Sequence, residues 1–281
     1  MGRYEKLLTW GLAAAAAMLC PPAATAGDLP FVERFGLQPV PQFAPVSDEQ
    51  EQDLLTRVRE FEFPQYLYSG CDERAHAAWM LLPPELQARV HKIWIVTPAM
   101  YTYAIPGAVR SSRAEPAYRA VDWGYHVALA YQSRRGLRII DAGLRPGESL
   151  TREQWLAEMA LSPLTFWTMT EASVYRFYTL SFTGAINESV WNGNSYRYDE
   201  GTAGQTPRDK NWIPDALARD AVGADAVRGT TCAAFRAIAT QPQTLLDRLR
   251  AGPTGAGDPC RSSFQRFTAE RQRWIERLSG G

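Results

Sequence analysis

Two β-rich runs joined by a short polar turn constrain the fold of this chain most strongly. The runs are 125–131 (YHVALAY) and 137–141 (LRIID), and the residues between them, QSRRG, are typical of a hairpin turn. With the turn at the two arginines, antiparallel pairing places Ala128 opposite Asp141. His126 lies two residues from Ala128 on the same face, so Asp141 becomes its diagonal neighbour, within reach of a hydrogen bond. A slip of one residue would put the two side chains on opposite faces.

A second feature is a cysteine at the start of a predicted helix. Apolar residues recur at helical spacing from Ala75 to Leu82, and two prolines at 83–84 end the pattern. A thiol at Cys71 would meet the backbone N–H groups of the first turn and the positive end of the helix dipole, which favour the thiolate. The same N–H groups can stabilise an oxyanion. Cys71 is therefore a candidate nucleophile, and the alternative is a small buried cysteine of ordinary reactivity.

These two features together suggest a Cys-His-Asp triad. His126 would take the thiol proton, and Asp141 would hold the imidazole in the correct tautomer. The other histidines fit less well, because His76 is predicted to face away from Cys71 on the helix and His91 to end a polar helical turn. Asp122 is the second candidate for the acid. No two histidines or cysteines stand at metal-ligand spacing, so we expect neither a metal nor another cofactor.

Three segments carry a recognisable pattern: G-C-x-x-R-A-H at 70–76, W-x-Y-H-V-A at 123–128 and R-I-I-D at 138–141. In these segments, within about residues 64–144, the chain resembles the bacterial protein-glutaminase family. The resemblance implies an α+β fold with a papain- and transglutaminase-like core, in which the nucleophile helix packs on an antiparallel sheet. It also implies deamidation of accessible glutamine side chains in proteins or peptides, with Cys71 as nucleophile, His126 as base and Asp141 as orienting acid. The same triad would serve a cysteine protease or a transglutaminase, and a non-enzymatic secreted binding module is a further alternative.

Four further residues are predicted to contribute to the oxyanion or substrate site: Gly70, Gln65, Trp123 and Tyr125. The side-chain amide of Gln65 could add a second oxyanion donor, whereas the alternative is a surface glutamine. Asp72 and Glu73, directly after the cysteine, depart from the family pattern. Two carboxylates there would oppose thiolate formation or contact the substrate.

The first 26 residues have the pattern of a cleavable export signal. Arg3 and Lys6 precede an apolar stretch, and A-T-A at 24–26 is typical of a cleavage site. We therefore expect a soluble protein, secreted or periplasmic. Removal of Arg3, Lys6 and Glu5 from the 30 basic and 30 acidic residues leaves 28 and 29. This balance predicts neither nucleic acid nor membrane as a partner, and it leaves the oligomeric state open.

In an oxidising compartment, Cys232 and Cys260 are natural disulfide partners, which leaves Cys71 outside the bond. A thiol in an exported protein needs a reason, and catalysis is one. The alternative is that Cys71 pairs with one of the other two.

The predicted organisation has an N-terminal arm and helix at 27–61, a catalytic core at 62–150 and a mostly helical accessory region at 151–281. Ser47 and Gln50 form a predicted capping box for the first helix, to Phe61. A long loop at 97–118 is a candidate to line the site. The aromatic-rich stretch 161–198 is predicted to form core, or else a substrate-binding surface. Further helices are expected at 85–90, 151–160, 225–239, 242–251 and 262–278, with a strand at 92–96.

Overall fold

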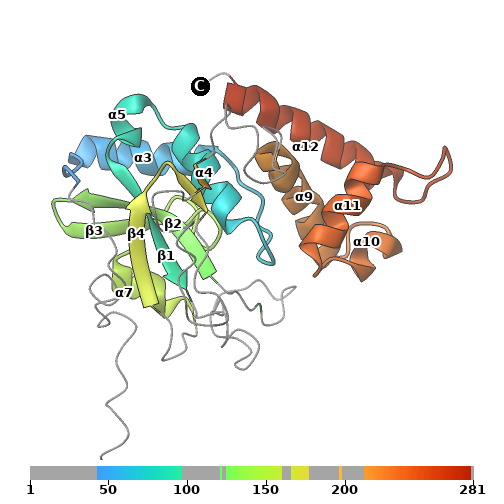
Figure 1. The fold of residues 1–281 in the computed structure, drawn as a ribbon, viewed down its shortest axis with the longest axis horizontal. Coiled ribbons are helices and arrows are strands. Elements are labelled where there is room, and N and C mark those ends of the chain that lie inside the picture. Colours follow the sequence, from blue (N-terminus) through green and yellow to red (C-terminus); the bar gives the residue numbers. More distant parts are fainter. Residues whose placement is uncertain are drawn as a thin grey trace, which may run out of the picture.

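An antiparallel four-stranded sheet, in the order β3-β2-β1-β4, lies at the centre of the N-terminal part of the fold (Figure 1). The computed structural model describes residues 43–96, 121, 125–159, 166–176, 196–197 and 212–279. The strands of the sheet are β1 (Val90–Val96), β2 (Tyr125–Ser133), β3 (Gly136–Ile140) and β4 (Phe166–Glu171). The helices around it are α3 (Asp48–Glu60), α4 (Cys71–Met80), α5 (Pro84–Gln87) and α7 (Arg152–Ala157). The mixed α+β class expected from the sequence is confirmed.

The β2–β3 hairpin has the predicted register. Leu129 pairs with Ile140, and the last pair before the turn joins Ser133 to Gly136. The backbone N–H of Arg135 donates to the Ser133 hydroxyl at 3.0 Å, and Gly136 takes the left-handed conformation (φ +100°) that closes the turn. Because the turn fixes the register, it also fixes which side chains share a face of the sheet.

Strand β4 was not predicted. It pairs with β1 over six residue pairs, so a segment assigned to the accessory region completes the central sheet. A second sheet consists of β5 (Val174–Arg176) and β6 (Tyr196–Arg197). This aromatic-rich stretch was predicted to form core or a substrate-binding surface, without strands. Tyr178, Phe182 and Trp191 within it lie outside the described residues, as do the predicted export signal and the predicted 97–118 loop.

The first helices follow their capping signals. In α3, the Ser47 hydroxyl accepts from the backbone N–H of Gln50, and the Gln50 side chain accepts from the backbone N–H of Ser47, as the predicted capping box requires. Thr151 and Gln154 cap α7 in the same way, and α7 ends at Ala157. The prediction of a helix at 85–90 was partly wrong, because α5 ends at Gln87. His91 consequently lies on β1, stacked on Phe43 with ring centroids 4.2 Å apart.

The C-terminal region is helical, as expected (Figure 1). It contains α9 (Trp212–Val227), α10 (Ala233–Ala237), α11 (Pro242–Ala251) and α12 (Arg261–Ser279). Helices α11 and α12 match the predicted ranges to within a residue. The prediction of one helix at 225–239 was wrong, because α9 ends at Val227 and Gly229 (φ +80°) turns the chain before α10 begins. Helix α9, not predicted, is buried on nearly all sides and packs against α12, α11 and α4.

A disulfide joins Cys232 to Cys260, as predicted, and ties the start of α10 to the start of α12. Such a bond is consistent with an exported protein. Within the part of the chain that the structure describes, no helix combines the length and apolarity needed to span a bilayer.

Candidate active site

Cys71 is the first residue of α4, as the sequence predicted. The residue before it, Gly70, has φ +83°, a conformation that residues with a side chain rarely adopt, and its carbonyl accepts the first bond of the helix from Arg74 N–H at 2.9 Å. The Cys71 side chain is half-buried and outside any disulfide. The thiol therefore stands at the positive end of a ten-residue helix, the position that favours a thiolate.

His126 and Asp141 are hydrogen-bonded across the hairpin. The Nε2 atom of His126 lies 2.6 Å from Oδ2 of Asp141, and both side chains are buried. Asp141 directly follows β3, so its position results from the β2–β3 register. The contact predicted from the sequence is thus present. A bond through Nε2 leaves Nδ1 as the basic nitrogen of a neutral imidazole.

Asp141 is held by more than His126. Its Oδ1 accepts from the backbone N–H groups of Gly143 (2.8 Å) and Leu144 (3.0 Å), and its Oδ2 also accepts from the indole N–H of Trp155 at 2.7 Å. Burial alone would raise the pKa of this carboxyl. The charge of His126 and these hydrogen bonds outweigh burial and lower the pKa to about 2. Asp141 therefore remains an acceptor near neutral pH.

Packing of α4 on β2 brings the cysteine to the same place as the acid. Cys71 and Asp141 line one small cavity of about 10 Å³, together with Arg74 on α4 and Val127 on β2. His126 is the residue before Val127 in β2. Packing of helix α4 against the β2–β3 hairpin therefore brings Cys71 and Asp141, which are 70 positions apart in the chain, to the same cavity.

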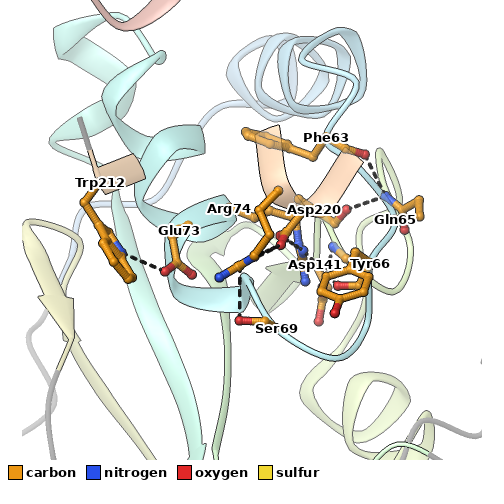
Figure 2. A network of polar contacts seen from close by, with 12 residues as sticks. Phe63, Gln65, Tyr66, Ser69, Glu73, Arg74, Asp141, Trp212 and Asp220 are labelled. Carbon is orange, nitrogen blue, oxygen red and sulfur yellow. Dashed lines mark hydrogen bonds and ion pairs between the residues drawn. The ribbon is translucent and has the colours of Figure 1, made fainter. Parts of the chain in front are cut away.

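Of the remaining predicted site residues, the structure describes Gln65 and Tyr125. Gln65 uses both amide hydrogens on backbone carbonyls, those of Phe63 (3.1 Å) and Ala142 (2.9 Å), as Figure 2 shows. It links the segment before Cys71 to the loop after Asp141. Tyr125 begins β2 and is half-buried, with its ring 6.0 Å from that of Trp94. Trp123 and Asp122 lie outside the described residues.

The acidic residues after Cys71 are buried within the protein. Glu73 accepts from the indole N–H of Trp212 on α9 at 3.0 Å (Figure 2). Asp72 lies near buried Lys92, whose Nζ is 2.8 Å from Nδ1 of His76. Burial lowers the pKa of both His76 and Lys92 well below the ordinary value. Since His76 is bonded within this buried cluster, its predicted structural role is supported.

Two parts of the site were missed by the sequence analysis. Trp155 lies in the helix predicted at 151–160, but nothing in the local pattern showed that its N–H would reach Asp141. The second part is a buried ion-pair cluster in which Asp220 of α9 contacts Arg74 at 2.9 Å. These residues are 146 positions apart, so no sequence spacing could have linked them.

The described residues contain no cluster of three or more histidine, cysteine or acidic side chains able to hold a metal ion.

Comparison with protein families gives one match: residues 46–159 fit the model of a family described as Glutaminase. A search of curated proteins returned no match. The matched segment includes Cys71, His126, Asp141 and Trp155, together with α3, α4 and the hairpin. A glutaminase is an amidohydrolase that acts on glutamine. Residues 46–159 of this protein are therefore similar to the glutaminase family.

Proposed function

We propose that this protein is an exported protein-glutamine deamidase with Cys71 as nucleophile, His126 as general base and acid, and Asp141 as the orienting carboxylate. The observation that carries the proposal is the 2.6 Å His126–Asp141 bond inside a segment that matches the glutaminase family. The position of Cys71 at the start of α4, packed against the strand of His126, supports its role.

The reaction begins with proton transfer from the Cys71 thiol to Nδ1 of His126. The thiolate then attacks the side-chain carbonyl carbon of a glutamine, and the C=O electron pair moves onto oxygen. Backbone N–H groups at the start of α4 stabilise this oxyanion, and the helix dipole favours the negative charge. Gly70 allows the chain to turn directly before these groups.

The tetrahedral intermediate collapses when His126 gives its proton to the leaving nitrogen. The C–N bond breaks, ammonia departs and a thioester joins the substrate to Cys71. His126 next removes a proton from water, which attacks the thioester and releases glutamate and the thiol. The buried carboxylate of Asp141 stabilises the imidazolium that forms in both half-reactions.

The helix-on-sheet arrangement and the order Cys, His, Asp along the chain favour a papain- and transglutaminase-like core. The Cys232–Cys260 disulfide supports export, for which residues 1–26 are the proposed signal. A substrate of this reaction is a protein or peptide with an exposed glutamine side chain. No cofactor enters the proposed steps.

The decisive experiment follows ammonia release from unfolded casein and measures the intact mass of the product, with Cys71→Ala as the matched control. Deamidation predicts a mass increase of about 1 Da per ammonia released, without chain cleavage, and none with the variant. Chain cleavage would instead indicate a protease, and incorporation of an added primary amine would indicate a transglutaminase. Absence of any Cys71-dependent product would overturn the proposal and favour a binding module.

A further inference from the structure

Helix α9 makes direct contact with the turn that carries Cys71, although it lies outside the segment that matches the glutaminase family. Asp220 of α9 has no exposed surface. Its Oδ2 accepts from Nη1 of Arg74 at 2.9 Å, and its Oδ1 accepts from Nη2 of Arg219 at 2.6 Å. Nη2 of Arg219 also donates to the hydroxyl of Ser69 at 3.2 Å. The carboxylate of Asp220 and the guanidinium of Arg219 thus contact residues on both sides of the Gly70–Cys71 peptide bond.

Gly70 is packed directly against this pair. A Cβ atom built on Gly70 would lie 1.8 Å from Oδ2 of Asp220 and 2.8 Å from Nη1 of Arg74, so the carboxylate occupies the space of the missing side chain. Arg74 Nη1 donates in addition to the backbone carbonyl of Tyr66 at 3.1 Å. Figure 2 shows Tyr66, Ser69, Arg74 and Asp220 gathered around this turn.

The same guanidinium approaches the loop of the orienting acid. A Cβ atom on Gly143 would be 3.2 Å from Nη2 of Arg74 and 3.3 Å from Oδ1 of Asp141. Arg74 therefore lies between α9 and the loop that follows Asp141. A shift of Arg74 would disturb the nucleophile turn and the acid loop together.

We propose that Asp220 and Arg219 are positioning residues for Cys71, and that α9 belongs to the catalytic unit. The pair fixes the Ser69–Gly70–Cys71 turn so that the thiol stays at the first turn of α4, facing the strand of His126. Small displacements of a reacting group cost large factors in rate, so loss of this support lowers kcat more than it changes KM. This inference rests on the proposed role of Cys71 as nucleophile.

The chain offers a matched control on the same helix. Asp215 of α9 is also buried and also accepts from two arginines, but these are Arg250 of α11 and Arg271 of α12, far in sequence from the nucleophile turn. Asp215→Asn and Asp220→Asn therefore remove equivalent carboxylates from one helix. Only the second variant loses contacts to the Cys71 turn.

Two readouts separate positioning from general stability: kcat and KM for casein deamidation, and the rate of Cys71 alkylation by iodoacetamide against pH, both well below each variant's Tm. We expect Asp220→Asn to lower kcat about 10- to 100-fold with KM nearly unchanged. Its alkylation profile against pH should shift away from that of the wild type, and the two rates should converge at alkaline pH, where every thiol is ionised. Asp215→Asn should lower Tm while leaving both readouts at wild-type values.

Equal alkylation profiles and equal kcat in Asp220→Asn and Asp215→Asn would overturn the inference. If Asp220→Asn does not fold, Ser69→Ala removes only one acceptor of Arg219, and a Cys71 alkylation rate equal to that of the wild type would then overturn it. Alkylation does not require turnover. Failure of the wild type to release ammonia would therefore refute the proposed function, while the alkylation comparison still decides the role of the α9 pair.

Discussion

His126 on strand β2 and Asp141, the residue directly after strand β3, are joined by a hydrogen bond of 2.6 Å between Nε2 and Oδ2, and Trp155 donates to the same Oδ2. The other oxygen, Oδ1, accepts from two backbone N–H groups. Each oxygen of the carboxylate therefore has only donors around it. An asparagine amide has only one acceptor oxygen, so it can replace only one of the two carboxylate oxygens as an acceptor.

Asp141→Asn should lower kcat by about 10²- to 10⁴-fold. The amide oxygen must take the Oδ1 position to keep the two backbone donors, which turns the NH₂ group toward His126. Nε2 then becomes an acceptor, the ring proton moves to Nδ1, and the imidazole can no longer take the thiol proton. Steady-state deamidation measures the loss. Asp215→Asn is the control for removal of a buried carboxylate, and more than a tenth of wild-type activity in Asp141→Asn would contradict this account.

Protonation of Asp141 at acid pH should lower the free energy of unfolding. Its pKa of about 2 lies below the ordinary value of about 3.9, so its contribution is present above about pH 4 and is lost as the pH falls toward 2. The shift corresponds to about 2–3 kcal/mol. Urea unfolding across this range should show a smaller loss for Trp155→Phe, which lacks one of the bonds that lower the pKa. An unchanged pH dependence in that variant would argue against the Trp155 contact.

His76 should make the protein less stable as the pH falls below its ordinary pKa of about 6.5. Burial lowers the pKa of His76 in the folded state, so the unfolded chain binds a proton that the folded protein does not, and stability is lost with acidification. His76→Gln keeps an acceptor for Lys92 and does not titrate. The dependence of the unfolding free energy on pH between about 7 and 5 should become shallower in this variant.

The residual slope in His76→Gln should come partly from half-buried His91, whose pKa burial also lowers. A slope identical to that of the wild type would show that His76 is protonated in the folded state, contrary to this prediction.

Reduction of the Cys232–Cys260 disulfide should destabilise the protein by about 3 kcal/mol, because the bond closes a loop with a sequence separation of 28. Thermal unfolding with and without reductant measures the effect. The Cys232→Ser, Cys260→Ser double variant should have the Tm of the reduced protein and should no longer respond to reductant. Cys71→Ser should respond as the wild type does, since Cys71 is outside the bond.

Gly70→Ala should destabilise the protein far more than Gly136→Ala. Both glycines have positive φ, but a Cβ on Gly136 would meet no atom within 4 Å, whereas one on Gly70 would overlap Asp220. Gly136→Ala therefore measures the backbone strain alone, about 1 kcal/mol. Gly70→Ala should lose at least about 2 kcal/mol more and most of its activity. Equal losses of unfolding free energy in urea would show that the turn relaxes away from α9.

The His126–Asp141 contact could be predicted from the sequence because it depends on local rules. The QSRRG turn sets the hairpin register, the register sets the faces, and the faces bring His126 and Asp141 together. The start of α4 at Cys71, the cap at Ser47 and the Cys232–Cys260 bond were likewise predictable from neighbouring residues or from cysteine number.

Tertiary structure alone decided the position of β4, the existence of α9 and the surroundings of the site. Strand β4 is specified by its pairing with β1, whose paired residues lie 70 to 80 positions earlier in the chain. Helix α9 is buried on almost every side, so its sequence lacks the alternation between apolar and polar faces that reveals a helix at a surface. Asp220 meets Arg74 because two helices pack together, and ion pairing between distant segments leaves no periodic trace in the sequence.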